Sequence, residues 1–351
     1  MVESIFSHLP LTFPLILISN MRYFHLQILL PSIFILLLSS CNDDKALDGT
    51  PFDYIQKTTI PGEGRACAVA FAINGKGYVA LGRNNAGSLN DCWQYDPTTD
   101  NWTKKSNFPS QGRVKAIAAV VNGNAYVGLG YCQEIGPTSN SSAYLPDFWM
   151  YDPVADKWTR KADFPSKYTD GCVCFVYNDE IYVGNGYDGS TSSSLFWKYI
   201  PSQDKWILLN KFSGTKRQIA AGCTGTNHCY FGTGFAGYSF NDWWEYFPAT
   251  DSWQKREALP DHGRQNTLAF AIGDRYFVAT GRYWKGSVTP NQYLRADVKE
   301  YDPNLNRWID RGEIPNGKRE NGIVFTIDGT VYLGLGEDDN GLVNNLWSFK
   351  P

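Results

Sequence analysis

Residues 93–113 read Trp-Gln-Tyr-Asp-Pro-Thr-Thr-Asp-Asn-Trp-Thr-Lys-Lys-Ser-Asn-Phe-Pro-Ser-Gln-Gly-Arg, and their spacing returns along the chain. Two tryptophans nine residues apart flank a Tyr-Asp-Pro turn. A Pro follows seven residues after the second Trp, and an Arg follows eleven residues after it. The second Trp recurs at Trp102, Trp158, Trp206, Trp253 and Trp308. The chain is therefore built from a repeat of about 50 residues, and a period of that length indicates one compact unit per repeat.

Each repeat is predicted to hold four short strands. After the Arg, small side chains alternate with larger ones, as Ala68 and Ala70 do with Val69, and a period of two is typical of a β-strand. Asn74-Gly75 then predicts a two-residue hairpin turn. A Tyr-Val strand, a loop of variable length, the strand of the first Trp, the Asp-Pro turn and the strand of the second Trp complete the repeat. We name these strands a to d in chain order.

Four-stranded repeats of this length resemble kelch-type β-propeller blades. The sixth repeat ends at Pro351 without its strand d, whereas Tyr54 stands in the register of the second Trp, eleven residues before Arg65. Phe52 to Lys57 is therefore predicted to supply the missing strand and to close the ring. The expected fold is all-β, a six-bladed kelch-type β-propeller over residues 52–351. It departs from the usual kelch pattern in carrying Gly-x-Gly rather than a double Gly.

The N-terminal segment resembles a bacterial export signal. Residues 1–40 form the signal region, and Met21 is the expected true start because an Arg and an apolar run follow it. Leu38-Ser39-Ser40-Cys41 resembles a lipobox, whose Cys is lipidated and becomes the mature N-terminus. Residues 41–51 are then the lipidated terminus and tether. The resemblance implies an outer-membrane lipoprotein of the cell envelope, anchored through Cys41 and facing the periplasm or the surface.

Charge and cysteine content exclude several classes of protein. The sequence has 32 Lys and Arg against 35 Asp and Glu, and this balance argues against nucleic-acid binding, which needs clustered positive charge. Without Cys41 an odd number of cysteines remains, so a complete set of disulfides is impossible. Cys172-Val173-Cys174 resembles a metal clip, but both cysteines fall at small, channel-facing positions of strand a. We therefore expect no metal and no cofactor.

One face of the ring is the expected ligand site. The b–c loops and d–a connections of an antiparallel blade emerge on the same face, and the Arg that precedes strand a in five of the six repeats lies there too. Guanidinium groups bind anions in a bidentate manner, and loop aromatics can stack on a sugar. The residues predicted to bind ligand are Arg65, Arg113, Arg217, Arg264, Arg319, Asp170, Gln218, Gln265, Tyr131, Tyr187 and Trp284. In the alternative interpretation, the arginines only bridge blades through carboxylates and carbonyls.

Candidate catalytic residues are sparse. His228 is expected at a hairpin tip on the opposite face and His262 in a d–a connection at the ligand face, so the two-His copper site of galactose-oxidase propellers is not expected. The weak acid/base candidates are His262 and Glu320. No Ser-His-Asp arrangement can be assembled from the sequence.

Two main functions follow from this pattern. The first is a non-catalytic, membrane-anchored binding module for a glycan or protein ligand. The second is implied by a distant resemblance to exported bacterial N-acetylneuraminate epimerases. It is a sugar epimerase or mutarotase that uses Glu320, Glu134 or Glu337 as acid or base. A purely structural role is a third interpretation, because propellers host all three.

Overall fold

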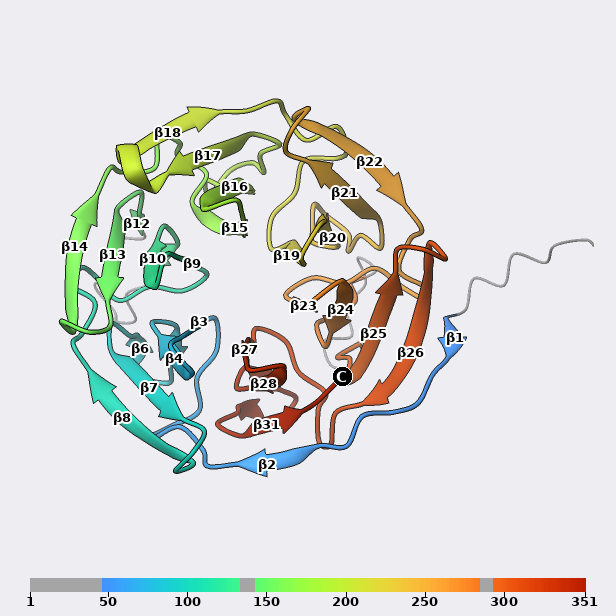
Figure 1. Ribbon diagram of the computed structural model, residues 1–351, viewed down its shortest axis with the longest axis horizontal. Helices are drawn as coiled ribbons and strands as arrows, with labels where there is room; N and C mark the ends of the chain where they lie inside the picture. The colour runs from blue at the N-terminus through green and yellow to red at the C-terminus, as the bar shows by residue number, and fades with distance from the viewer. Residues whose placement is uncertain (1–45, 133–142, 285–292) are drawn as a thin grey trace, which may run out of the picture. The chain divides into compact units, whose positions relative to one another are not determined.

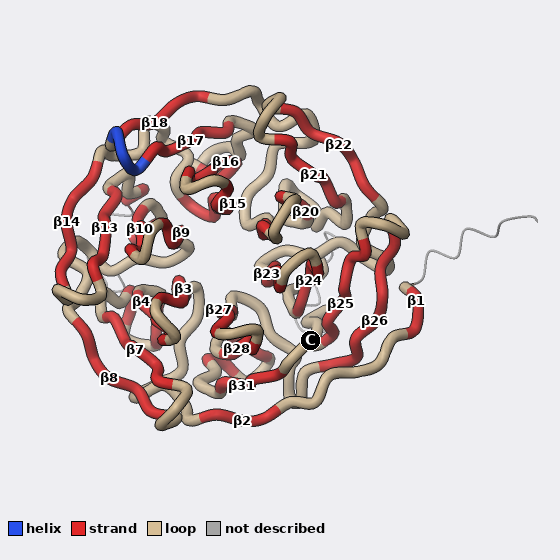
Figure 2. The backbone as a smooth tube through the Cα atoms, viewed as in Figure 1, coloured by secondary structure: helices blue, strands red, loops and turns tan. Residues whose placement is uncertain are grey.

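A computed structural model describes residues 46–132, 143–284 and 293–351. Over these residues the chain forms six antiparallel sheets, arranged as blades around a central axis (Figure 1). Within the described residues, strands and loops make up nearly the whole chain, and the one helical turn is η1 (Pro201–Gln203) (Figure 2). The predicted all-β six-bladed propeller is confirmed.

The strands of each blade follow one another from the centre outward in the order a, b, c, d. Blade 1 contains β3 (Val69–Ile73), β4 (Lys76–Ala80), β7 (Cys92–Asp96) and β8 (Asn101–Lys105). Blade 2 contains β9 (Ile117–Val121), β10 (Asn124–Gly128), β13 (Phe148–Asp152) and β14 (Lys157–Lys161). Blade 3 contains β15 (Asp170–Tyr177), β16 (Glu180–Tyr187), β17 (Phe196–Ile200) and β18 (Lys205–Leu208).

The second half of the ring repeats this plan. Blade 4 contains β19 (Ala221–Thr224), β20 (Cys229–Gly232), β21 (Trp243–Phe247) and β22 (Ser252–Arg256). Blade 5 contains β23 (Leu268–Ile272), β24 (Arg275–Ala279), β25 (Asp297–Asp302) and β26 (Arg307–Glu313). Blade 6 contains β27 (Ile323–Ile327), β28 (Thr330–Gly334), β31 (Leu346–Phe349) and β2 (Ile55–Lys57). Small b–c hairpins pair β5 (Arg83–Asn84) with β6 (Gly87–Ser88), β11 (Tyr131–Cys132) with β12 (Ala143–Tyr144), and β29 (Glu337–Asp338) with β30 (Gly341–Leu342).

The ring closes where the sequence predicts. β2 pairs antiparallel with β31, with Gln56 opposite Trp347, so the N-terminal segment supplies strand d of blade 6. The ring of Phe52 stacks on that of Phe349 at a centroid distance of 5.1 Å and continues the seam beyond the strand. Closure of this kind removes the open sheet edges on which other chains pair.

Part of the predicted tether is docked on the propeller. β1 (Leu47–Asp48) pairs in parallel with β26 and gives blade 5 a fifth strand. A Cβ at Gly49 would lie 2.5 Å from the Asp310 carbonyl oxygen, so only glycine fits this close approach. This strand is not predictable from the sequence, because two residues carry no readable alternation.

The hydrophobic core lies between neighbouring blades. Val69 and Phe71 of blade 1 cluster with Val127 and Tyr151 of blade 2, and the other blade pairs repeat this arrangement. The small residues of the same strands, such as Ala68, line the central channel. The alternation in strand a therefore sends the large side chains into the core and the small ones to the axis.

The first Trp of the repeat, Trp93 in blade 1, is replaced by Lys299 in blade 5, and the structure gives a local reason for this replacement. In blade 1, Trp93 Nε1 donates to the carboxylate of Asp91 at 2.7 Å. In blade 5, Lys299 replaces the Trp, and its ammonium lies 3.5 Å from the equivalent Asp297 and 2.6 Å from Asp310. The Lys therefore supplies the donor that the indole supplies in blades 1, 2 and 4.

Candidate functional site at the channel mouth

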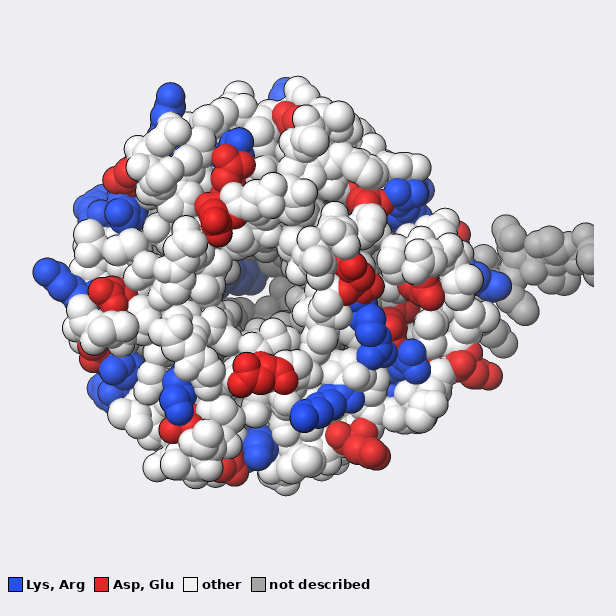
Figure 3. Space-filling model, viewed as in Figure 1, with Lys and Arg blue, Asp and Glu red and all other residues white. Residues whose placement is uncertain are grey.

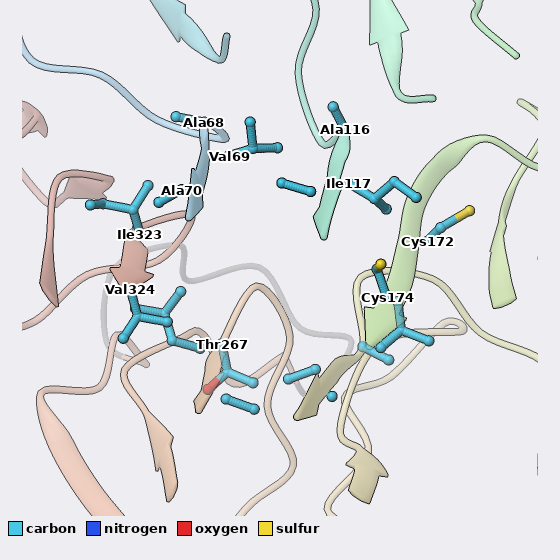
Figure 4. A pocket seen from close by; sticks show the side chains of 18 residues that line it. Ala68, Val69, Ala70, Ala116, Ile117, Cys172, Cys174, Thr267, Ile323 and Val324 are labelled. Atoms are coloured by element: carbon cyan, nitrogen blue, oxygen red, sulfur yellow. The ribbon is translucent and has the colours of Figure 1, made fainter. Parts of the chain in front are cut away.

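The central channel is narrow and is lined by uncharged side chains, most of them small. A cavity of about 210 Å³ runs along the axis, lined by the inner strands of all six blades. Figure 4 shows Ala68, Ala116, Cys172, Cys174 and Thr267 around this space. The predicted channel-facing position of the two cysteines is confirmed. No charged side chain lines the channel cavity, so the channel offers no ionic group to a ligand.

The five arginines are buried inside the blades rather than exposed on the ligand face. Arg113 is fully buried, and its guanidinium holds Asp147 in a bidentate pair with N–O distances of 2.7 and 3.0 Å. Nη1 of Arg113 also donates to the Leu129 carbonyl at 3.1 Å. The equivalent pairs are Arg65–Asp91, Arg217–Asp242, Arg264–Asp297 and, with an amide in place of the carboxylate, Arg319–Asn345. We therefore correct the prediction that these arginines line the ligand face, because their guanidinium groups are already hydrogen-bonded within the protein.

Each arginine ties two blades together. The Arg113 amide donates to the Leu89 carbonyl, and its carbonyl accepts from the Gly82 amide, both in the b–c loop of blade 1. Its side chain is bound by blade 2, as described above. The structural interpretation of the arginine column, which the sequence left open, is the one that the geometry supports.

Blade 3 lacks both members of this pair. Thr169 replaces the Arg, and Leu195 replaces the Asp two residues before the Trp. The Thr169 hydroxyl donates instead to the Gly130 carbonyl at 3.2 Å. The absence of both the Arg and the Asp is physically reasonable, because the presence of only one of them would leave a buried charge without a partner. It also marks blade 3 as the exceptional blade.

We use "mouth" for the channel end on the face of the b–c loops and d–a connections. Three positions per blade surround it, and each contributes a set of six residues. The first, directly after the Arg position, comprises Ala66, Val114, Asp170, Gln218, Gln265 and Glu320. The second comprises Cys67, Lys115, Gly171, Ile219, Asn266 and Asn321. The third, at the start of the b–c loop, comprises Arg83, Tyr131, Tyr187, Phe235, Arg282 and Glu337. The first and third sets pair across every blade, from Ala66 with Arg83 to Glu320 with Glu337.

The second set forms a girdle around the opening. All six residues have φ between 49° and 62°, a region that side chains rarely adopt. Backbone amides pass hydrogen bonds from blade to blade, as from Lys115 to the Cys67 carbonyl at 3.2 Å and from Ile219 to the Gly171 carbonyl at 2.8 Å. A cavity of about 130 Å³ lies within this girdle. The mouth therefore has a fixed backbone frame whose chemistry is decided by side chains.

Blades 5, 6 and 1 form a half of the mouth whose charges are paired with one another. Glu320 binds Arg282 at 2.6 Å and accepts from the Asn266 amide at 2.7 Å. Glu337 accepts from the Asn321 amide at 2.7 Å and forms an ion pair with Arg83. We call these six residues, Arg83, Asn266, Arg282, Glu320, Asn321 and Glu337, the paired half. Two of the acid/base candidates, Glu320 and Glu337, are thus held by guanidinium groups.

Blades 2, 3 and 4 form a half of the mouth that is rich in aromatic rings. The Tyr131 and Tyr144 rings lie 5.1 Å apart, and Tyr144 meets Tyr187 edge-on at 6.4 Å. We call Lys115, Tyr131, Tyr144, Asp170, Tyr187 and Phe235 the aromatic half. Sequence analysis predicted Tyr131, Asp170 and Tyr187 as ligand residues, and the structure brings these three together.

Asp170 is a buried carboxyl within the aromatic half. It is 8% exposed, and its Oδ1 accepts no hydrogen bond from the described residues. Lys115 Nζ lies 3.9 Å from the same oxygen. Burial raises the pKa of Asp170, and the Lys115 charge opposes that rise. Burial, with the nearby Asp170 charge, raises the pKa of Tyr144 to about 12.

The remaining candidates are spread around the mouth. Gln218 and Gln265 are half-buried in the first set, and the Gln265 Oε1 has no hydrogen-bond partner among the described residues. The His262 ring stacks on Tyr283 at 4.3 Å, and the Trp284 amide donates to the Ser239 hydroxyl at 2.9 Å. Glu134 lies outside the described residues, as do the lipidation candidate Cys41 and the signal region.

The described residues contain no cluster of metal-ligating side chains and no helix long and apolar enough to cross a membrane. His228, on the opposite face, is hydrogen-bonded through Nδ1 to the Glu245 carboxylate and lies away from His262. Figure 3 shows one face of the ring, hollowed at its centre, with charges of both signs interspersed around it. No single-sign patch stands out on this face, which agrees with the near-balanced composition.

Comparisons with known proteins agree with this architecture. The kelch motif matches residues 64–109. Kelch-like protein 23 of Homo sapiens is 24% identical over 192 residues, which cover 50% of this chain and 30% of that protein. The solved structure of YjhT superposes with a TM-score of 0.69 at 19% identity, covering 83% of this chain and 96% of that one. The chain is therefore a six-bladed β-propeller, and the kelch motif matches its first blade.

Three residues of the aromatic half, Lys115, Tyr144 and Phe235, are not among the residues predicted to bind ligand. Lys115 stands in the girdle position, where the six side chains share no chemical type, so the register alone does not single it out. Tyr144 lies in the variable loop of blade 2, where the repeat gives no register. The joint absence of the Arg and its Asp in blade 3 was a readable signal of an exceptional blade.

Proposed function

We propose that this propeller is a carbohydrate-binding module whose ligand lies on the aromatic half of the mouth. The observation that carries the proposal is the grouping of aromatic rings at the loop-start position of three successive blades, Tyr131, Tyr187 and Phe235, beside polar groups. Aromatic walls with a few convergent polar groups are typical of small-ligand sites, and rings can pack on the apolar face of a sugar.

A glycan array tests this proposal. We expect the purified protein to bind a subset of glycans and Tyr187→Ala to weaken that binding roughly tenfold, since a stacking face is lost. The matched control is Tyr177→Ala, because Tyr177 ends the same strand pair at the opposite face. Absence of binding to every glycan, with capture of a protein partner instead, would contradict the carbohydrate proposal.

The epimerase alternative is tested on the same material. Its named acid/base candidates Glu320 and Glu337 are ion-paired with Arg282 and Arg83, an arrangement that favours a structural role. Anomer exchange of N-acetylneuraminic acid, followed by NMR, would have to accelerate in the presence of the protein for the enzyme interpretation to stand.

The location of the protein is a separate part of the proposal. We expect Cys41 to carry a lipid that holds the propeller at the outer membrane of the cell envelope. Incorporation of labelled palmitate in a bacterial host should be lost in Cys41→Ser. Incorporation that is unchanged in the variant would contradict the anchor.

A further inference from the structure

Asp170 and Glu320 occupy the same repeat position in opposite blades. Each directly follows the Arg position. Each also pairs with the residue at the start of the b–c loop of its own blade, Asp170 with Tyr187 and Glu320 with Glu337. Each carboxyl also faces the preceding blade, since Lys115 of blade 2 lies next to Asp170 and Asn266 of blade 5 binds Glu320. The two sites are therefore the same backbone arrangement with different side chains.

The groups that satisfy Glu320 are replaced around Asp170. Arg282, which binds Glu320 at 2.6 Å, corresponds to Tyr131 in blade 2, and the Asn266 amide corresponds to Lys115. Asp170 is also one methylene shorter than Glu320. As a result, Asp170 Oδ1 lacks a hydrogen bond from the described residues, although this oxygen is buried and the residue is only 8% exposed. A buried acceptor without a donor is costly, and a ligand that donates to it recovers that cost.

The surroundings of Asp170 restrict the kind of ligand. A carboxylate and an ammonium 3.9 Å apart present an acceptor and a donor side by side. A cation would be repelled by Lys115, and an anion by Asp170. Adjacent sugar hydroxyls fit both groups, because each hydroxyl donates and accepts. Tyr131, Tyr144 and Tyr187 supply ring faces next to this pair.

We infer that Asp170 and Lys115 anchor two adjacent hydroxyl groups of a neutral sugar. This assignment rests on the proposed carbohydrate-binding function. It adds the class of ligand, a neutral sugar, and the two residues that bind its hydroxyl groups. Asp170 is then retained for binding although its burial disfavours the charged form. The paired half, in which Glu320 is satisfied by the protein, has no such role.

Binding should weaken on acidification. The titratable groups that act on Asp170 or feel its charge are Lys115, Tyr144 and Cys172. Burial raises the pKa of Cys172, and the pKa of Tyr144 is about 12, so both stay neutral below pH 8. Asp170 is then the group that changes charge as the pH falls, and its protonation removes the strong acceptor.

The test compares Asp170→Asn with Glu320→Gln, two matched amide substitutions at equivalent positions. Binding is measured by titration calorimetry with glucose, galactose, mannose, N-acetylglucosamine and N-acetylneuraminic acid, and the melting temperature is measured without ligand. For Asp170→Asn we expect about tenfold or greater loss of neutral-sugar affinity with an unchanged or raised melting temperature. For Glu320→Gln we expect a lowered melting temperature, and Lys115→Met should weaken sugar binding without unfolding the protein.

The outcomes separate the two levels of the proposal. If the wild-type protein binds a neutral sugar and Asp170→Asn binds it equally well, the anchor assignment is overturned and the carbohydrate function stands. Preference for N-acetylneuraminic acid would overturn the neutral-sugar assignment. A fall in melting temperature of Asp170→Asn like that of Glu320→Gln would make Asp170 structural. If no carbohydrate binds the wild-type protein, the proposed function fails as well.

Discussion

The paired half and the aromatic half of the mouth share one backbone frame and use it in opposite ways. In the paired half, Arg282 and the side-chain amide of Asn266 each donate a hydrogen bond to one carboxylate oxygen of Glu320. In the aromatic half, the equivalent positions leave Asp170 Oδ1 without a donor among the described residues. The comparison shows that the repeat position of a residue determines where its polar group lies. The neighbouring side chains determine whether that polar group is available to a ligand.

The arginine column gives the same lesson inside the blades. Arg113 stands at the correct face for an anion site, yet Asp147 and the Leu129 carbonyl already occupy its guanidinium. In blade 3 the pair is absent on both sides, at Thr169 and Leu195. Asp170, whose Oδ1 has no hydrogen-bond donor among the described residues, lies in the same blade.

Breaking the paired half should have the largest effect on stability. Arg282→Met removes the cation from the carboxylate of Glu320, whose side chain is 8% exposed, so the free energy of unfolding should fall by about 3 kcal/mol. Urea denaturation measures the change. The control is Arg160→Met, which removes the exposed Arg160–Asp163 pair and should cost less than about 1 kcal/mol. Equal losses in the two variants would contradict the claim that the buried Arg282–Glu320 pair stabilises the fold more than an exposed ion pair does.

Converting the aromatic half into a paired half should have an intermediate effect. The triple variant Lys115→Asn, Tyr131→Arg, Asp170→Glu copies the residues of blades 5 and 6 onto blades 2 and 3. We expect the free energy of unfolding to rise by about 1 kcal/mol, because the open carboxyl gains donors, and sugar binding to be lost. Calorimetry and urea denaturation test both parts. Retained sugar binding in a folded triple variant would show that the ligand lies elsewhere.

The smallest expected effect is on the pH dependence of stability. Burial raises the pKa of Asp170 in the folded state above its unfolded value, so the folded state binds the proton more tightly. The resulting destabilisation is present above the folded pKa and disappears as the pH falls toward the unfolded value. Thermal melts of wild type and Asp170→Asn between pH 3.5 and about 7 should therefore diverge as the pH rises, with the variant the more stable at neutral pH. Parallel curves would mean that burial does not perturb this carboxyl.

The sequence predicts the fold well and the site only in part. The register of Trp102 and its counterparts defines six repeats, and Tyr54 in the same register predicts the closing strand that β2 provides. The same register places Arg113 at the mouth face but does not show that Asp147 satisfies it. Availability depends on contacts across neighbouring blades and loops, which one repeat does not contain.

Residue-resolved NMR on the protein with a bound neutral sugar tests the central claim most directly. The account predicts that the backbone amides of Lys115, Asp170 and Tyr187 change chemical shift on titration, whereas those of Arg282 and Glu320 change little. Shifts confined to the paired half, or to the opposite face around Tyr177, would contradict the assignment of the ligand to the aromatic half.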